Sequence, residues 1–133
     1  MIVIVSIDKE FDNYTELASC LNQIASSENF REFSSLDHPL LQRYLKEFNK
    51  PIQFFKIEWG NIKGAPNVKT NKFGKPYDAD APIAAAKKIL DYSSHCVEFG
   101  KGNYNISQCL KDKDITMINL PKEVKNANKR YRF

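Results

Sequence analysis

Two short polar segments carry the residues of this chain that are best suited to hold a ligand. Ser6 and Asp8 follow the apolar run 2–5. The second segment follows the apolar run 95–99 and consists of Gly100, Lys101, Gly102 and Asn103. Side-chain oxygens can hydrogen-bond a ribose, glycines let the backbone approach a ligand closely, and a lysine neutralises a phosphate. Both segments therefore indicate nucleotide binding, with an ordinary strand-to-helix turn as the alternative for each.

The segment 58–79 is a third candidate, because it is long, basic and aromatic and has no apolar periodicity. Loops of this length inside compact domains are usually functional or mobile. Trp59 and Tyr77 can stack on a nucleobase while Lys75 meets a phosphate, which is the arrangement of a lid over a nucleotide. The alternative is that Trp59 only covers the core and the lysines are only solvated.

Acid–base chemistry has weaker support in the sequence. We expect His95 to be structural at the start of a buried strand and His38 to be exposed at a helix start, and neither has a serine or cysteine nearby that suggests a triad. A hydrolase would need a carboxylate as general base. The candidates for that role are Glu10, Glu58, Asp8 and Asp80.

The cysteines suggest neither a metal site nor disulfides. Cys20, Cys96 and Cys109 are odd in number, far apart and without C-x-x-C spacing. We expect buried thiols in a reducing cytosol, and no metal or cofactor.

The apolar patterns predict alternating strands and helices that would position these segments. Strands are expected at 2–5, 30–33, 52–57, 95–99 and 115–118, with a turn at 34–37. Helices are expected from Asp12 or Asn13 to about 25, from Asp37 or Pro39 to 48, from Asp78 or Asp80 to 92, and over 106–110. The uniformly apolar run 2–5 is typical of a central strand that is buried on both faces. The sequence thus predicts one α/β doubly wound domain of about five mostly parallel strands with helices on both faces.

Length and charge restrict the function classes. With 133 residues the chain is expected to form one domain over 1–120, followed by a basic tail at 121–133. The chain has a formal charge of +4, and residues 119–133 alone carry +4, so the rest is neutral overall. This balance argues against a nucleic-acid-binding body and leaves only the tail to touch phosphates. No membrane span or signal peptide is evident, so we expect a cytoplasmic protein.

Several short motifs resemble those of the SLOG superfamily of Rossmann-like nucleotide-binding domains, in its short bacterial and phage branch. The G-S-R-x-F-x-D-Y opening of that branch corresponds to residues 5–14, which keep Ser6, Phe11 and Tyr14. A tryptophan, a Gly-Lys step, a helix start with proline and a Phe-Gly strand end follow in the same order. They correspond here to Trp59, Gly74 with Lys75, Pro82, and Phe99 with Gly100. The chain departs from the family where Ser34 and Ser35 replace a glycine loop and where Ala84 and Ala85 replace an Arg-Asn pair.

The resemblance implies a Rossmann-like fold and a non-catalytic binder of a nucleotide or nucleotide-derived signal, NAD-derived signals included. It implies a ligand site that includes Phe11, Ser34, Ser35 and Pro82 beside the two segments described first. It further suggests a phage protein that sequesters a host defence signal, and pairing into a dimer. A nucleotide hydrolase and a protein-binding module with a degenerate pocket, acting on a host partner, remain the alternatives.

Overall fold

The computed structural model describes residues 1–120, so the basic tail lies outside the described residues. In chain order the elements are β1 (Ile2–Ile7), α1 (Tyr14–Ala25), β2 (Glu32–Leu36), α2 (Pro39–Phe48), β3 (Ile52–Phe55), β4 (Val68–Thr70), β5 (Pro76–Asp78), α3 (Ala81–Tyr92), β6 (His95–Phe99), α4 (Tyr104–Leu110) and β7 (Thr116–Met117). Within these residues no helix is long and apolar enough to cross a membrane.

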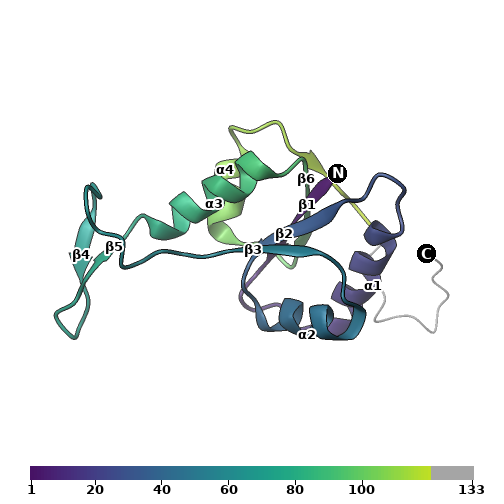
Figure 1. The fold of residues 1–133 in the computed structure, drawn as a ribbon, viewed down its shortest axis with the longest axis horizontal. Coiled ribbons are helices and arrows are strands. Elements are labelled where there is room, and N and C mark those ends of the chain that lie inside the picture. Colours follow the sequence, from purple (N-terminus) through teal and green to yellow (C-terminus); the bar gives the residue numbers. More distant parts are fainter. Residues whose placement is uncertain (121–133) are drawn as a thin grey trace.

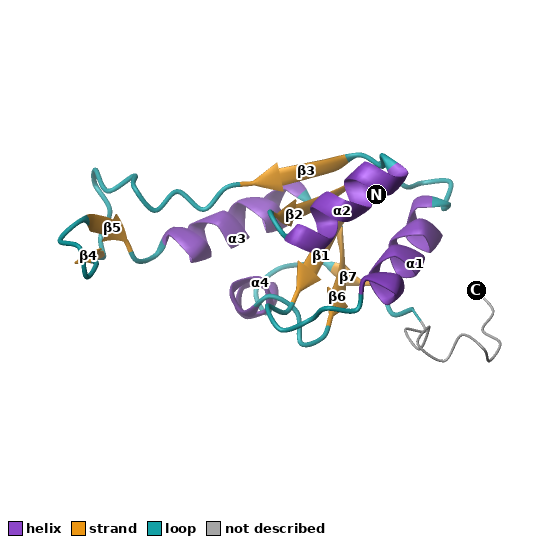
Figure 2. Cartoon of the chain, turned by 90° about the horizontal axis from the view of Figure 1, so that it is seen from below, coloured by secondary structure: helices purple, strands orange, loops and turns teal. Residues whose placement is uncertain are grey.

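Five strands form one parallel sheet in the order β3-β2-β1-β6-β7 (Figures 1 and 2). Helices α1 and α2 share one core with the sheet, and α3 and α4 share the other. The predicted doubly wound α/β domain with a central first strand is therefore confirmed.

The side chains of β1 explain why its sequence is uniformly apolar. Val3, Val5 and Ile7 belong to the core on the α1–α2 side, whereas Ile4 packs with Ala86 and Ile89 of α3. A strand that is covered on both faces needs an apolar side chain at nearly every position. Ser6 is the polar exception and is fully buried near the end of the strand.

The first two helices begin and end at residues suited to those positions. Asn13 caps α1 by accepting the Glu16 N–H at 3.1 Å. His38, rather than Asp37, caps α2, because its Nδ1 accepts the Leu40 N–H at 3.1 Å. Asn49 ends α2 in the left-handed conformation with φ 50°, which asparagine tolerates better than most residues.

The second strand was predicted at 30–33 with a turn at 34–37, and this placement is wrong. Ser34 and Ser35 lie inside β2 and are buried, with hydroxyls that find partners within the fold. Ser35 Oγ donates to the Val5 carbonyl at 2.9 Å, and Ser34 Oγ lies 2.6 Å from Ser93 Oγ. Two satisfied hydroxyls are compatible with a buried strand, although adjacent serines are typical of turns.

The segment 58–79 was predicted as a loop, but it contains the antiparallel pair β4–β5. Residues 60–77, which we call the arm, extend from the sheet beyond β3 and the start of α3 (Figures 1 and 2). Two backbone hydrogen bonds close its base, from Asp78 N to Trp59 O at 2.8 Å and from Ala79 N to Asn67 O at 3.0 Å. The arm is thus a defined β-ribbon.

Further boundaries differ from the prediction, since β1 runs to Ile7 rather than to residue 5 and β7 is Thr116–Met117 rather than 115–118. Two other differences concern β3 and α4. Strand β3 ends at Phe55 rather than at residue 57. Helix α4 begins at Tyr104 rather than Ile106, because Asn103 is the cap and accepts the Ile106 N–H at 3.1 Å. The end of β3 and the start of α4 both lie at the carboxyl edge of the sheet, so these differences change which residues can line a site there.

Candidate functional site

The strand order places a crevice between the carboxyl ends of β1 and β6. From β1 the chain proceeds outward to β2 and β3, and it then crosses back to β6 on the other side of β1. Open α/β sheets bind their ligands where the strand order reverses in this way, because the two connections diverge there. The segments after β1 and β6, which carry Asp8 and Lys101, meet at this crevice.

Hydrogen bonds join these two segments. The Asn103 N–H donates to Ser6 Oγ at 2.7 Å, and the Asp8 N–H donates to the Phe99 carbonyl at 3.0 Å. Ser6 is buried, so its hydroxyl holds the glycine turn beneath the crevice instead of facing a ligand. This role differs from the direct ligand contact that we expected for Ser6.

The glycines of the turn are required by conformation and by close packing. Gly100 and Gly102 have φ of 65° and 74°. A Cβ at Gly102 would lie 2.9 Å from Glu98 Oε2 and 3.0 Å from Ser6 Oγ, and one at Gly100 would lie 3.0 Å from the Asp8 Cβ. Only glycine fits this path without displacing its neighbours.

A cavity of about 500 Å³ opens over this turn. It is lined by Ile7, Asp8, Lys9, His38, Lys101, Gly102, Asn103, Tyr104, Asn105 and Ser107. A second cavity of about 220 Å³ shares Ile7, His38 and Asn103 with it and extends towards β2. We call the two together the β1–β6 groove, and the larger one alone has the size of a small-molecule site.

His38 links the two cavities and has a defined tautomer. Since its Nδ1 accepts the Leu40 N–H, the proton of the neutral ring is on Nε2. Burial lowers the pKa of His38 below its usual 6.5, while the nearby Asp37 carboxylate opposes this shift. His38 thus offers the groove a neutral imidazole near pH 7. We expected it to be exposed, but it is half-buried.

Of the residues predicted to bind a ligand, one group meets at the groove. Asp8, Lys101, Gly102 and Asn103 line the larger cavity, and Ser35 lines the smaller one. Three other predicted residues take supporting positions. Gly100 lies in the turn, Phe11 packs on Phe99 with ring centroids 5.4 Å apart, and Ser34 is buried inside β2.

The predicted lid residues lie elsewhere. Trp59 and Tyr77 pack edge to face at the base of the arm, with ring centroids 5.8 Å apart, and Lys75 is near its tip. Pro82 lies in the first turn of α3. None of these four is among the residues that line the groove. A cavity of about 70 Å³ beside the arm, lined by Glu58, Asp78 and Lys88 among others, is too small for a nucleotide.

The sequence analysis missed Lys9, His38, Tyr104, Asn105 and Ser107 as groove residues. Tyr104 and Asn105 immediately follow the glycine turn, so a helix start at 104 instead of 106 would have indicated them. Ser107 donates to Glu98 Oε2 at 3.1 Å, which fixes that carboxylate below the turn. His38 had no local signal, because it reaches the groove only through the pairing of β2 with β1.

Fold and site together define a Rossmann-like α/β domain with an open groove at its strand-order switch point. Comparison of the chain with protein-family models, curated proteins and solved structures gave no match. Among residues 1–120, no three His, Cys, Asp or Glu side chains are grouped so that they could hold a metal ion.

Proposed function

We propose that the β1–β6 groove binds a nucleotide or nucleotide-derived molecule without turning it over. The observation that carries this proposal is a cavity of about 500 Å³ over a glycine turn at the strand-order switch point. Its location is the one at which doubly wound sheets hold nucleotides.

The polar side chains of the groove suit the parts of such a ligand. Lys9 and Lys101 supply two ammonium groups for phosphate oxygens, and both are exposed. Asp8 and Asn105 supply acceptors for ribose hydroxyls. Tyr104, with 72% of its surface exposed, offers an aromatic face to a base. Tyr104 therefore replaces Trp59 and Tyr77 as the proposed stacking residue.

A hydrolase is the second candidate, and one observation favours it. Asp8 lines the same cavity as His38, whose Nε2 carries a proton because Nδ1 accepts from Leu40. Asp8 can accept a proton from an attacking water, and the Nε2–H of the neutral imidazole can donate a hydrogen bond to an oxygen on which negative charge develops.

Native mass spectrometry of the protein purified from cells, followed by denaturing release of bound molecules, separates these functions. A released nucleotide of unchanged mass supports the binder, whereas a free base or ribose phosphate supports the hydrolase. Calorimetric titration with AMP, ATP, NAD and ADP-ribose then ranks the ligands. A bare polypeptide that binds none of them contradicts both functions.

A matched pair of lysine variants tests the location of the site. Lys101→Ala is expected to weaken binding by about tenfold or more, since a hydrogen bond to a charged group contributes about 1.5–3 kcal/mol. Lys46→Ala removes another exposed lysine, from α2 and away from the groove, and is expected to leave affinity unchanged. Equal effects of the two substitutions would place the ligand outside the groove.

A further inference from the structure

The charge of the described residues is separated between the arm and the rest of the fold. The arm contains four lysines and no acidic residue, so it carries +4. The remaining positions up to residue 118 contain eleven Lys or Arg and fifteen Asp or Glu, which gives −4. The net charge of residues 1–118, which argued against a nucleic-acid-binding surface, is therefore near zero only because a basic arm and an acidic remainder of the fold cancel.

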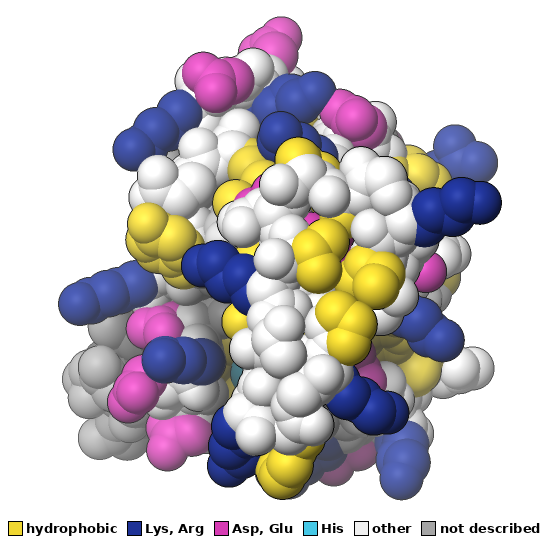
Figure 3. Space-filling view, turned by 90° about the vertical axis from the view of Figure 1, so that its left-hand side faces the viewer, with side chains coloured by type: hydrophobic (Ala, Val, Ile, Leu, Met, Phe, Trp, Pro, Cys, Tyr) yellow, Lys and Arg dark blue, Asp and Glu magenta, His cyan; other side chains and the backbone are white. Residues whose placement is uncertain are grey.

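All four lysines of the arm, Lys63, Lys69, Lys72 and Lys75, are exposed. Figure 3 faces the end of the molecule from which the arm projects and shows dark-blue basic side chains around exposed apolar ones. A basic surface that projects from an acidic body meets a polyanion first, because the body repels the same ligand.

The tip of the arm presents an apolar side chain between lysines. Phe73 is 80% exposed, and the Lys72 ammonium lies 5.2 Å from its ring centroid. Asn71 fixes the turn, since its Oδ1 accepts the N–H groups of Phe73 at 2.8 Å and Lys75 at 3.0 Å. Gly74, with φ of 79°, completes the turn. The exposed phenyl ring thus projects from a hydrogen-bonded turn.

We propose that the arm binds B-form double-stranded DNA, with the β4–β5 ribbon in the major groove. The groove is about 12 Å wide and admits a two-stranded β-ribbon. Lysines at the tip and along β4 would contact phosphates on both sides, while Phe73 would contact thymine methyl groups. A projecting ribbon fits a groove, whereas single strands are usually bound in concave channels. This activity is independent of the nucleotide site.

Fluorescence anisotropy with a labelled duplex of about 20 base pairs tests this proposal in the full chain. The triple variant with Lys69→Gln, Lys72→Gln and Lys75→Gln is expected to bind the duplex at least about tenfold more weakly than the parent protein at low salt. The slope of log K against log salt should fall by about 0.9 for each phosphate that the variant no longer neutralises. Phe73→Ala should weaken binding with an unchanged slope, because it removes an apolar side chain and no charge.

The matched control, Lys46→Gln, Lys87→Gln, Lys111→Gln, removes the same charge from exposed positions outside the arm and should bind nearly as the parent does. Circular dichroism checks that all variants are folded. Equal losses of affinity in the two triple variants would overturn the proposal, since they indicate attraction by net charge or by the tail. The proposal would also be overturned if single-stranded DNA or duplex RNA bound as tightly as duplex DNA does. The same holds if polyglutamate displaced the labelled duplex as well as unlabelled duplex DNA does.

Discussion

Gly102 shows at the scale of one residue how the fold constrains the candidate site. Its backbone is left-handed, and its missing side chain leaves space that Glu98 and Ser6 nearly fill. Both neighbours also make hydrogen bonds to residues of the turn or of α4, so they are not free to move aside. Position 102 therefore requires glycine both for its left-handed backbone and for the lack of space for a side chain.

We predict that Gly102→Ala lowers the free energy of unfolding by about 1–3 kcal/mol, the cost of a strained backbone residue together with the displaced neighbours. Urea denaturation followed by circular dichroism measures the change. Gly60→Ala is the control, because nothing lies within 4 Å of the added Cβ and φ is not in the left-handed range. A Gly102→Ala protein as stable as the parent would show that the turn has another conformation.

His38 makes the stability dependent on pH. Its pKa is lowered in the folded protein, so below about pH 6.5 the unfolded chain binds a proton that the folded chain resists. The contribution of neutral His38 to the free energy of unfolding is therefore fully present above pH 6.5. It is lost as the pH falls through the pKa of His38 in the folded protein. We predict that His38→Asn, which keeps a capping side chain, loses less stability than the parent between pH 7 and 5. Identical pH profiles in denaturant melts would refute this role.

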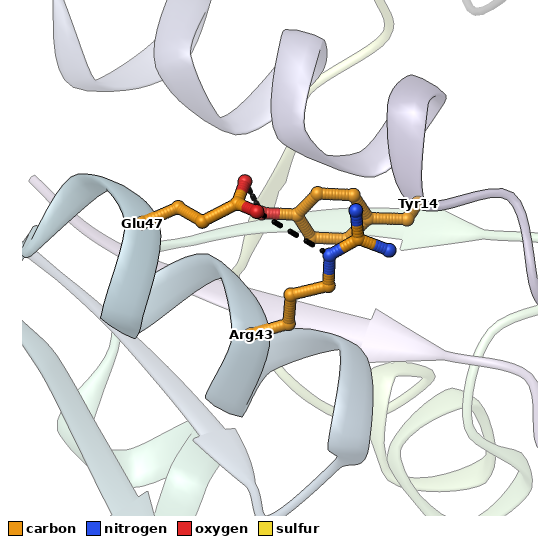
Figure 4. Close-up of polar contacts among 3 residues, drawn as sticks. All are labelled: Tyr14, Arg43 and Glu47. Atoms are coloured by element: carbon orange, nitrogen blue, oxygen red, sulfur yellow. Dashed lines mark hydrogen bonds and ion pairs between the residues drawn. The ribbon is translucent and has the colours of Figure 1, made fainter.

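At the scale of elements, a three-residue contact joins α1 to α2 (Figure 4). Tyr14 Oη donates to Glu47 Oε1 at 2.7 Å, and the Arg43 guanidinium lies 3.8 Å from the centroid of the Tyr14 ring. Burial and the hydrogen bond to the Glu47 carboxylate raise the pKa of Tyr14 to about 12. The start of α1, which follows the Asp8 segment, is thus tied to the end of α2.

A double-mutant cycle with Tyr14→Phe and Glu47→Gln tests whether this contact stabilises the fold. We predict a coupling free energy of about 1 kcal/mol in urea denaturation, since the acceptor is charged but partly solvated. Glu47→Gln should also lower the pKa of Tyr14, observed as phenolate absorbance at a lower pH. Additive single-mutant effects would show that the hydrogen bond between Tyr14 and Glu47 adds nothing to the free energy of unfolding.

The elements also show which parts of the fold a sequence can reveal. The spacing of Leu17, Leu21 and Ile24 predicted α1, because that pattern is local and reports one buried face. Ser35 was misplaced because its partner, the Val5 carbonyl, is thirty residues away. The β4–β5 pair was missed because its strands have three residues each and little buried apolar surface to produce an alternating pattern.

At the scale of the whole molecule, the strand order explains where the groove lies and why some of its residues were not predicted from the sequence. The two polar segments singled out in the sequence follow β1 and β6, and these strands are neighbours in the sheet. The sequence did not predict that His38 joins them, since this depends on β2 lying on the other side of β1. The arm and the groove occupy different parts of the molecule, so the two proposed activities can be measured separately.

The central claim is that the β1–β6 groove is the nucleotide site, and NMR amide-shift mapping tests it most directly. A nucleotide that binds in calorimetry is titrated into ¹⁵N-labelled protein. We predict that the largest shifts cluster at residues 7–9, at His38 and at 100–107, with little change in the arm. Shifts concentrated on residues 60–77 would contradict the account, and so would the absence of binding by every nucleotide tested.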